Sequence, residues 1–176
     1  MNKLTTKTGN YRWRILTLLF FATTINYIDR QVIGILKPFI AEDLGWSEAD
    51  YGYIVTAFQI AYAIGLVATG RFLDKFGTRI GYLWAIIMWS IAGMAHAAAR
   101  GVVSFVIVRF TLGLGQSANF PAAVKSVAEW FPKKERALAA GLFNSGSTIG
   151  AILAPIIVSG ITLAMGWQWA FIITGA

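Results

Sequence analysis

The sequence contains no cysteine, and His96 is its only histidine. Without cysteine the chain cannot form disulfide bonds, thiolate metal sites or a cysteine nucleophile. No cluster of metal-ligating residues and no nucleophile paired with a base occurs at a common depth in the sequence. We therefore expect no enzymatic activity, no bound metal and no cofactor.

Charged residues are also scarce. They make up 13% of the 176 residues, whereas hydrophobic residues make up 57%. Soluble domains carry about 25% charged residues and roughly 45–50% apolar residues. This composition excludes an ordinary soluble domain and indicates a membrane protein.

Apolar runs long enough to cross a hydrocarbon core of about 30 Å predict an all-α integral membrane fold. Five runs are complete, and they cover residues 14–39, 52–72, 80–98, 102–124 and 138–163. A sixth run, 167–176, is too short to cross, at about 15 Å of helix. We therefore expect a single transmembrane unit over 1–176 whose sixth helix is incomplete.

The formal net charge is +7, with 15 basic and 8 acidic residues. Most of the basic residues fall at one set of helix ends: Lys3, Lys7, Arg12 and Arg14, then Arg71, Lys75 and Arg79, then Lys133, Lys134 and Arg136. Acidic residues gather at the opposite side, between 42 and 50. The positive-inside rule then predicts a cytoplasmic N-terminus in the cell (inner) membrane. The basic excess reflects topology, and we expect no nucleic-acid partner.

Local signals mark helix starts and helix packing. Ser47 and Asp50 have the spacing of a capping box that opens the second helix. Small residues let helices approach closely in a bilayer, and glycines recur in the fourth and fifth runs at Gly113, Gly115, Gly141, Gly146 and Gly150. Pro121 and Pro155 are expected to kink those helices.

Three charges, Asp29, Arg30 and Arg109, lie inside apolar runs. A charge near the bilayer centre costs about 2.5–3.5 kcal/mol on insertion scales, so three facing lipid would cost roughly 8–10 kcal/mol. These side chains should therefore face the protein interior or a water-filled cavity.

Depth and helical spacing predict a site for a small anion. Counted from the nearer helix ends at 1.5 Å per residue, Arg30 lies roughly 13 Å deep, Arg109 roughly 11 Å and Tyr62 about 15 Å. Polar residues share faces with them: Asn26 and Lys37 with Arg30, Gln59 with Tyr62, and Gln116 with Arg109. Two guanidiniums beside amide and phenol groups suit a carboxylate. Alternatively, Asp29 forms a purely structural ion pair with one arginine.

Several aromatic residues have simpler interpretations. His96 lies near the end of the third run, where an interfacial imidazole requires no function. Trp84, Trp89, Trp167 and Trp169 are expected to face lipid or the membrane interface.

Several segments in order resemble one transporter family. "GRFLDKFGTR" resembles the signature loop of the major facilitator superfamily, matching at Gly70, Asp74, Lys75, Gly77 and Arg79. "RFTLGLGQSANFPA" is similar to its arginine-containing helix. "NYIDR" and "AEWFPKKERALAAGLFNSGS" resemble its anion:cation symporter family, and most of all the bacterial hexuronate transporters.

The resemblance implies a proton-coupled transporter of twelve helices that works by alternating access. This chain would be its N-terminal six-helix half, and its partners would be protons, a small anionic substrate, lipid and the missing C-terminal half. Arg30 would hold the substrate carboxylate, Tyr62 would line the pocket, and Asp29 would be a protonatable switch coupled to Arg109. Family members commonly have glutamate where this chain has Gln116, which cannot titrate. Asp74 would contact the other half and stabilise one closed state.

Two other interpretations remain open. The substrate could be another sugar acid or organic anion, such as galactonate or glucarate, and the chain could also be a non-transporting membrane receptor or a fragment.

The charge distribution makes the orientation testable. Single cysteines that replace Ser47 or Lys134 in the cysteine-free protein should differ in how they are labelled in intact cells, because an impermeant thiol reagent reaches only the outer side of the membrane. We expect labelling at position 47 alone. Labelling only at position 134 would reverse the topology.

Overall fold

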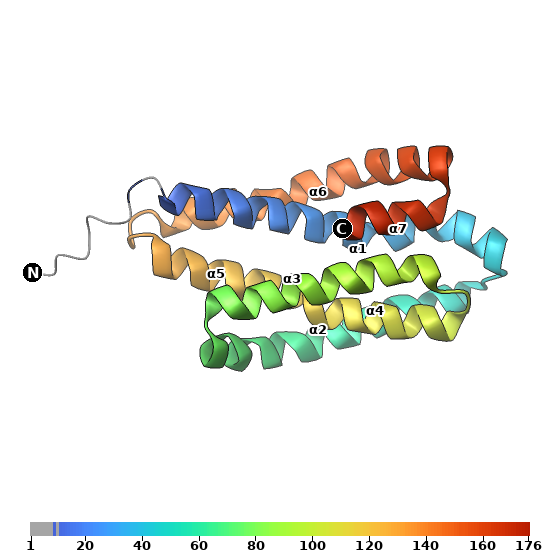
Figure 1. Ribbon diagram of the computed structural model, residues 1–176, viewed down its shortest axis with the longest axis horizontal. Helices are drawn as coiled ribbons and strands as arrows, with labels where there is room; N and C mark the ends of the chain where they lie inside the picture. The colour runs from blue at the N-terminus through green and yellow to red at the C-terminus, as the bar shows by residue number, and fades with distance from the viewer. Residues whose placement is uncertain (1–8, 10) are drawn as a thin grey trace, which may run out of the picture.

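The computed structural model describes Gly9 and residues 11–176, and the ordered elements of this part of the chain are all helical (Figure 1). They are α1 (Tyr11–Leu44), α2 (Glu48–Phe76), α3 (Thr78–Ala95), the short 3-10 helix η1 (His96–Ala98), α4 (Val102–Gln116), α5 (Asn119–Trp130), α6 (Arg136–Met165) and α7 (Trp167–Gly175). This architecture confirms the predicted all-α class.

Four helical segments are long and apolar enough to span a membrane: 48–76, 78–98, 102–130 and 136–165. The helices extend beyond the predicted apolar runs, so that α1 begins at Tyr11 and ends at Leu44 rather than covering 14–39. Backbone hydrogen bonding continues into polar residues that an apolar run does not include. The helices are therefore longer than the apolar runs that predicted them, and α1, which contains the first predicted run, is not among the four segments.

The predicted helix over 102–124 is interrupted. α4 ends at Gln116, and α5 begins at Asn119 and continues to Trp130. Pro121 lies in the first turn of α5 and supplies no N–H to the carbonyl of Ser117, so a regular helical hydrogen bond is missing there. Pro155 has a milder effect, because α6 continues through it.

The helices pack as two long pairs. α1 packs along α6, and α2 packs along α4. In Figure 1, α1 and α6 lie on one side of the bundle and α2 on the other. α3 contacts α4 and α7, and α7 also contacts α1 and α6, so these helices connect the two pairs.

Glycines allow the close approach within each pair. A Cβ atom at Gly146 would lie 2.6 Å from the Phe20 carbonyl oxygen of α1, and one at Gly113 would lie 2.6 Å from the Phe58 oxygen of α2. The packing role predicted for these glycines is confirmed. Gly141 does not share it, since nothing lies within 4 Å of its Cβ position.

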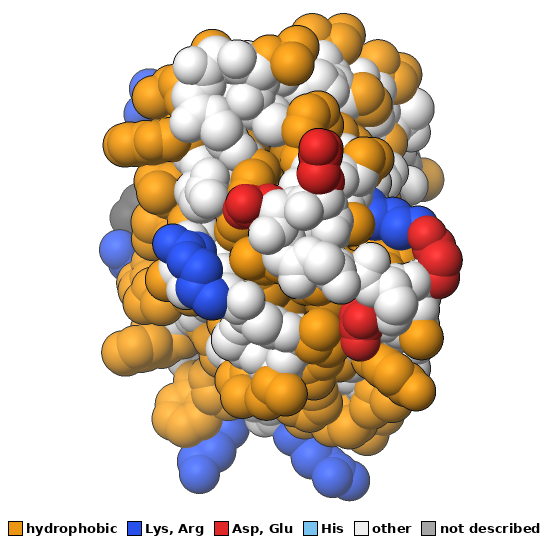
Figure 2. All heavy atoms as spheres, turned by 90° about the vertical axis from the view of Figure 1, so that its right-hand side faces the viewer, with side chains coloured by type: hydrophobic (Ala, Val, Ile, Leu, Met, Phe, Trp, Pro, Cys, Tyr) orange, Lys and Arg blue, Asp and Glu red, His pale blue; other side chains and the backbone are white. Residues whose placement is uncertain are grey.

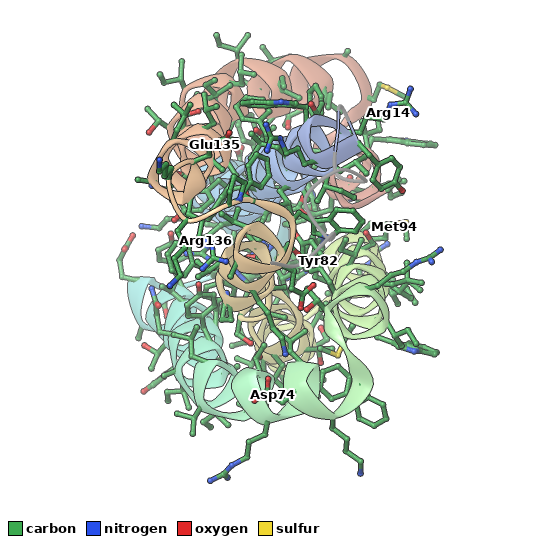
Figure 3. All side chains as sticks on the ribbon, turned by 90° about the vertical axis from the view of Figure 1, so that its left-hand side faces the viewer. Arg14, Asp74, Tyr82, Met94, Glu135 and Arg136 are labelled. Carbon is green, nitrogen blue, oxygen red and sulfur yellow. The ribbon has the colours of Figure 1, made fainter. Side chains whose placement is uncertain are left out.

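The two ends of the bundle differ in charge. The acidic end, at the α1–α2 turn, carries Glu42, Asp43, Glu48 and Asp50, and Figure 2 shows carboxylates among apolar side chains there. At this end the predicted capping box is present, because Ser47 N donates to Asp50 Oδ2 at 2.9 Å and Asp50 N donates to Ser47 Oγ at 3.2 Å. At the opposite, basic end, where Figure 3 labels Arg14 and Arg136, Arg12 pairs with Glu135 at 3.1 Å.

Two of the four tryptophans do not lie where they were expected. Trp84 is 60% exposed and Trp169 45%, as suits lipid-facing side chains. Trp89 and Trp167 are only 2% and 6% exposed, because each faces neighbouring helices. An apolar run does not reveal which of its faces is covered.

The glycine contacts predict a specific stability effect. In Gly146→Ala the added methyl group would meet the backbone of α1, so we expect destabilisation of about 1–3 kcal/mol, as for other overpacked sites. Gly160→Ala in the same helix is the control, since its Cβ position is open. Thermal unfolding in detergent, followed by near-UV circular dichroism, compares the two. Equal midpoints would show that α1 and α6 do not depend on this contact.

Candidate functional site

Buried polar side chains form two stripes that face each other across the bundle. α1 contributes Thr23, Asn26 and Asp29, and the α4–α5 segment contributes Arg109, Gln116 and Asn119. Asn119 Nδ2 donates to Thr23 Oγ1 at 3.4 Å, and Arg109 Nη2 donates to the Arg30 carbonyl oxygen at 3.0 Å. We call these six residues the polar seam.

Hydrogen bonds at the two ends of the seam set its register. α1 and the α4–α5 segment run in opposite directions. Asn26 lies three residues after Thr23 and Gln116 lies three residues before Asn119, so the two amides are at about the same depth in the bundle. Both amide side chains are buried, and no atom of the described residues forms a hydrogen bond with them.

Arg30 lies beside the seam among aromatic rings. Its Cζ lies 4.6 Å from the ring centroid of Tyr62, 5.0 Å from that of Tyr27 and 5.3 Å from that of Phe58. The side chain is only partly buried, and its Nε atom has no hydrogen-bond partner among the described residues. The rings orient a planar cation and leave its hydrogen-bonding groups available.

Arg109 lies close to the same group of rings but is itself buried. Its Cζ is 5.2 Å from the Phe58 ring centroid, so one aromatic ring contacts both guanidiniums. Within the described part of the chain, Nε and Nη1 of Arg109 have no hydrogen-bond partner. Gly113, one turn along α4, allows the close α2–α4 contact that brings Arg109 to Phe58.

Asp29 is buried, whereas the adjacent Arg30 is partly exposed. The carboxylate lies near the Thr174 side chain of α7 and near Arg109. Neither carboxylate oxygen of Asp29 has a hydrogen-bond partner among the described residues, and none of the ion pairs among them includes Asp29. The structure therefore does not contain the purely structural ion pair considered from the sequence.

The other residues predicted for the pocket lie at different distances from the two arginines. Tyr62 stacks on Phe58 with ring centroids 5.8 Å apart, and so belongs to the Arg30 environment. Gln59 lies on the exposed face of α2. Lys37 is held by Glu48 at 2.6 Å at the acidic end, so it does not join the arginines.

The motif at the α2–α3 junction is mostly helical rather than a loop. Gly70, Asp74 and Lys75 lie in the last turns of α2, Arg79 lies in α3, and only Gly77, at φ 78°, separates the helices. Asp74, labelled in Figure 3, accepts from Lys125 of α5 at 2.6 Å. One turn along α5, Glu129 accepts from Thr78 at 2.7 Å.

Sequence reasoning missed several residues. Tyr27 and Phe58 complete the aromatic environment of Arg30, and Lys125 holds Asp74. Tyr27 precedes Arg30 by three residues, a spacing that places both on one helix face and could have indicated the contact. Phe58 and Lys125 come from other helices, and no local spacing indicates them.

No group of three or more metal-ligating side chains occurs among the described residues. An apolar groove of about 600 Å³ lies between α2, α3 and α4, where it is lined by residues such as Gly65, Trp84 and Met88. It is separate from the arginines and offers no charge to an anion.

Comparison with known proteins places the chain in a family. The profile described as Major Facilitator Superfamily matches residues 19–176. The hexuronate transporter of Escherichia coli strain K12 is 36% identical over 170 residues, covering 97% of this chain and 39% of that protein. The galacturonate transporter of Dickeya chrysanthemi is 37% identical, covering 97% and 49%.

A solved structure shows the same fold. It is that of a bacterial homolog of the human lysosomal transporter Spinster, in an inward-facing and occupied conformation, with a TM-score of 0.87 and 23% identity. The match covers 96% of this chain and 42% of that one. The chain thus spans less than half the length of each of these three proteins.

Proposed function

The chain belongs to the Major Facilitator Superfamily, a family of transporters rather than enzymes. On that premise we propose that it is the N-terminal half of a secondary transporter for small organic anions, with hexuronates as the first candidate substrates. The transporter works by alternating access, and its second six-helix half closes the substrate cavity. Support comes from the names of the hexuronate and galacturonate transporters, which the chain matches over 39% and 49% of their lengths.

The observation that carries the proposal is the environment of Arg30. Three aromatic rings hold its guanidinium, and the side chain remains partly exposed. A planar guanidinium binds a carboxylate through two parallel hydrogen bonds. Hexuronates carry one carboxylate and several hydroxyl groups, so Arg30 would bind the carboxylate, and Asn26, Gln59 and Tyr62 are proposed to complete this half of the pocket.

A second candidate substrate is an aldonate or aldarate. The D-galactonate transporter of Escherichia coli O6:H1 is 35% identical over 170 residues, almost as similar as the hexuronate transporters. All of these sugar acids carry a carboxylate, and the missing half would supply contacts that discriminate among their hydroxyl groups. A direct comparison of substrates decides between them.

Proton coupling is proposed to use Asp29, with Arg109 as its electrostatic partner. Asp29 is the carboxylate of the polar seam, whereas Gln116 is a neutral amide. Coupling requires that substrate occupancy change the proton affinity of Asp29, and linkage makes this dependence reciprocal. Asp74, which Lys125 holds at the α2–α3 junction, is proposed to help stabilise one closed state.

The substrate proposal predicts a strong effect of Arg30→Lys. An ammonium keeps the charge but cannot form the paired hydrogen bonds, so we expect binding about tenfold to a hundredfold weaker. Binding and proteoliposome uptake of glucuronate, galacturonate, galactonate and phosphate by the complete protein provide the measurement. Arg100→Lys, at an exposed arginine, is the control. If the Arg30→Lys protein binds substrate with the parental affinity, Arg30 is not the residue that binds the carboxylate.

The coupling proposal predicts that Asp29→Asn abolishes uphill accumulation driven by a pH gradient but spares substrate binding and exchange. Gln116→Glu should make uptake more dependent on pH, because it adds a second titratable group to the seam. Glu42→Gln, at an exposed acid, is the control. Undiminished accumulation by the Asp29→Asn protein would move the coupling site to the other half.

A further inference from the structure

Gly34 leaves a notch on the surface of α1, one turn beyond Arg30 toward the acidic end. It follows Arg30 by four residues, so the two positions share a face of the helix. Gly34 is exposed, and a Cβ atom built there would have the Tyr51 hydroxyl oxygen of α2 at 3.4 Å. Within the described part of the chain, that oxygen is the one atom printed within 4 Å of the Cβ position, so the notch is otherwise open.

Tyr51 reaches the notch from the beginning of α2. Its half-buried ring packs against a buried apolar cluster, and the Lys37 ammonium lies 5.0 Å from the ring centroid. Both carboxylate oxygens of Glu48 accept from that ammonium, at 2.7 and 2.6 Å. These contacts hold the ring in place and leave its hydroxyl group beside the exposed Gly34.

The notch lies on the same two helices as the aromatic environment of Arg30. Lys37 meets Tyr51, and Arg30, seven residues earlier on α1, meets Phe58, seven residues later on α2. The two helices therefore run antiparallel in a constant register between these contacts. The rise is about 6 Å from Arg30 to Gly34 along α1 and about 10 Å from Phe58 to Tyr51 along α2.

A six-carbon sugar acid has a suitable length and suitable groups for this arrangement. With its carboxylate on Arg30, its hydroxyl groups extend along the helices toward Gly34, whereas an acid of two carbons would end at the guanidinium. The phenolic hydroxyl of Tyr51 can both donate and accept a hydrogen bond, as a sugar hydroxyl can. Lys37, the cation beside the ring, is neutralised by Glu48, so the notch suits a hydroxyl group better than a second carboxylate.

We propose that Tyr51 is a specificity-determining residue of the substrate site, and that its hydroxyl group binds a sugar hydroxyl in the notch at Gly34 while Arg30 binds the carboxylate. This inference rests on the proposed function and deepens it. The N-terminal half then contributes to the selection of the length and hydroxylation of the substrate, in addition to the contacts assigned to the missing half.

Removing the hydroxyl group from each partner in turn tests the contact. Binding of glucuronate and of its monodeoxy analogues is measured for the complete protein and for its Tyr51→Phe and Tyr53→Phe variants. Tyr53, which is 66% exposed on another face of α2, is the control. We expect Tyr51→Phe to bind glucuronate about two- to tenfold more weakly than the parent, as for the loss of one hydrogen bond, and Tyr53→Phe to match the parent.

The analogues separate a direct contact from a packing effect. The parent should bind one deoxy analogue about two- to tenfold more weakly than glucuronate, and this difference should disappear in Tyr51→Phe, because the hydrogen bond is already absent. A purely structural role of Tyr51 would weaken glucuronate and every analogue by the same factor.

Gly34→Ala tests the notch independently. The added methyl group would meet the Tyr51 oxygen at 3.4 Å, which is an ordinary contact, so the thermal midpoint should stay at the parental value. Because the methyl group fills the space beside the hydroxyl, we expect glucuronate binding to weaken about tenfold or more. Gly52→Ala, at an exposed position with nothing within 4 Å, is the matched control and should bind as the parent does.

The outcomes distinguish this inference from the proposed function. If the affinity ratios between glucuronate and all its deoxy analogues are the same in Tyr51→Phe as in the parent, Tyr51 does not bind the sugar. Parental binding by Gly34→Ala would show that the substrate does not enter the notch. In both cases, loss of binding in Arg30→Lys would leave the proposed function in place. A parent that binds no sugar acid would instead contradict the proposed function, and this inference with it.

Discussion

The cost of removing polar groups from water is the constraint on which the rest of this structure depends. Asp29 and Arg109 lie inside otherwise apolar helices, and neither can face hydrocarbon without several kcal/mol of penalty. The helices therefore turn these side chains toward each other, and the polar seam follows. The same constraint explains why Asp29 and Arg109 are both almost completely buried inside the bundle.

Two guanidiniums of like charge can occupy that zone because aromatic rings lie between and around them. Phe58 contacts both Arg30 and Arg109 with the face of its ring, and each such contact is worth about 0.5–2 kcal/mol. Gly113 permits the helix approach on which this arrangement depends. The helix packing at Gly113 and the positions of the two arginines therefore depend on each other.

Different residues of the site were predictable to different degrees. The sequence indicated Asp29, Arg30 and Arg109 because a charge within an apolar run needs a protein partner or water. It indicated Tyr62 through depth, since residues on neighbouring helices can be compared at 1.5 Å per residue. It misplaced Lys37, because helical spacing shows which residues share a face but not that Glu48 lies near enough to hold the ammonium.

The sequence by itself determined the membrane class, the approximate spans, the capping box at Ser47 and the need to bury three charges. These follow from composition and from interactions within one helix, which extend only three or four residues. Only the tertiary structure decided that α4 and α5 separate before Pro121, that the Phe58 ring contacts two arginines, and that Asn26, Gln116 and His96 are buried. Each of these depends on the register and rotation of one helix against another, and contacts between distant parts of the chain set both.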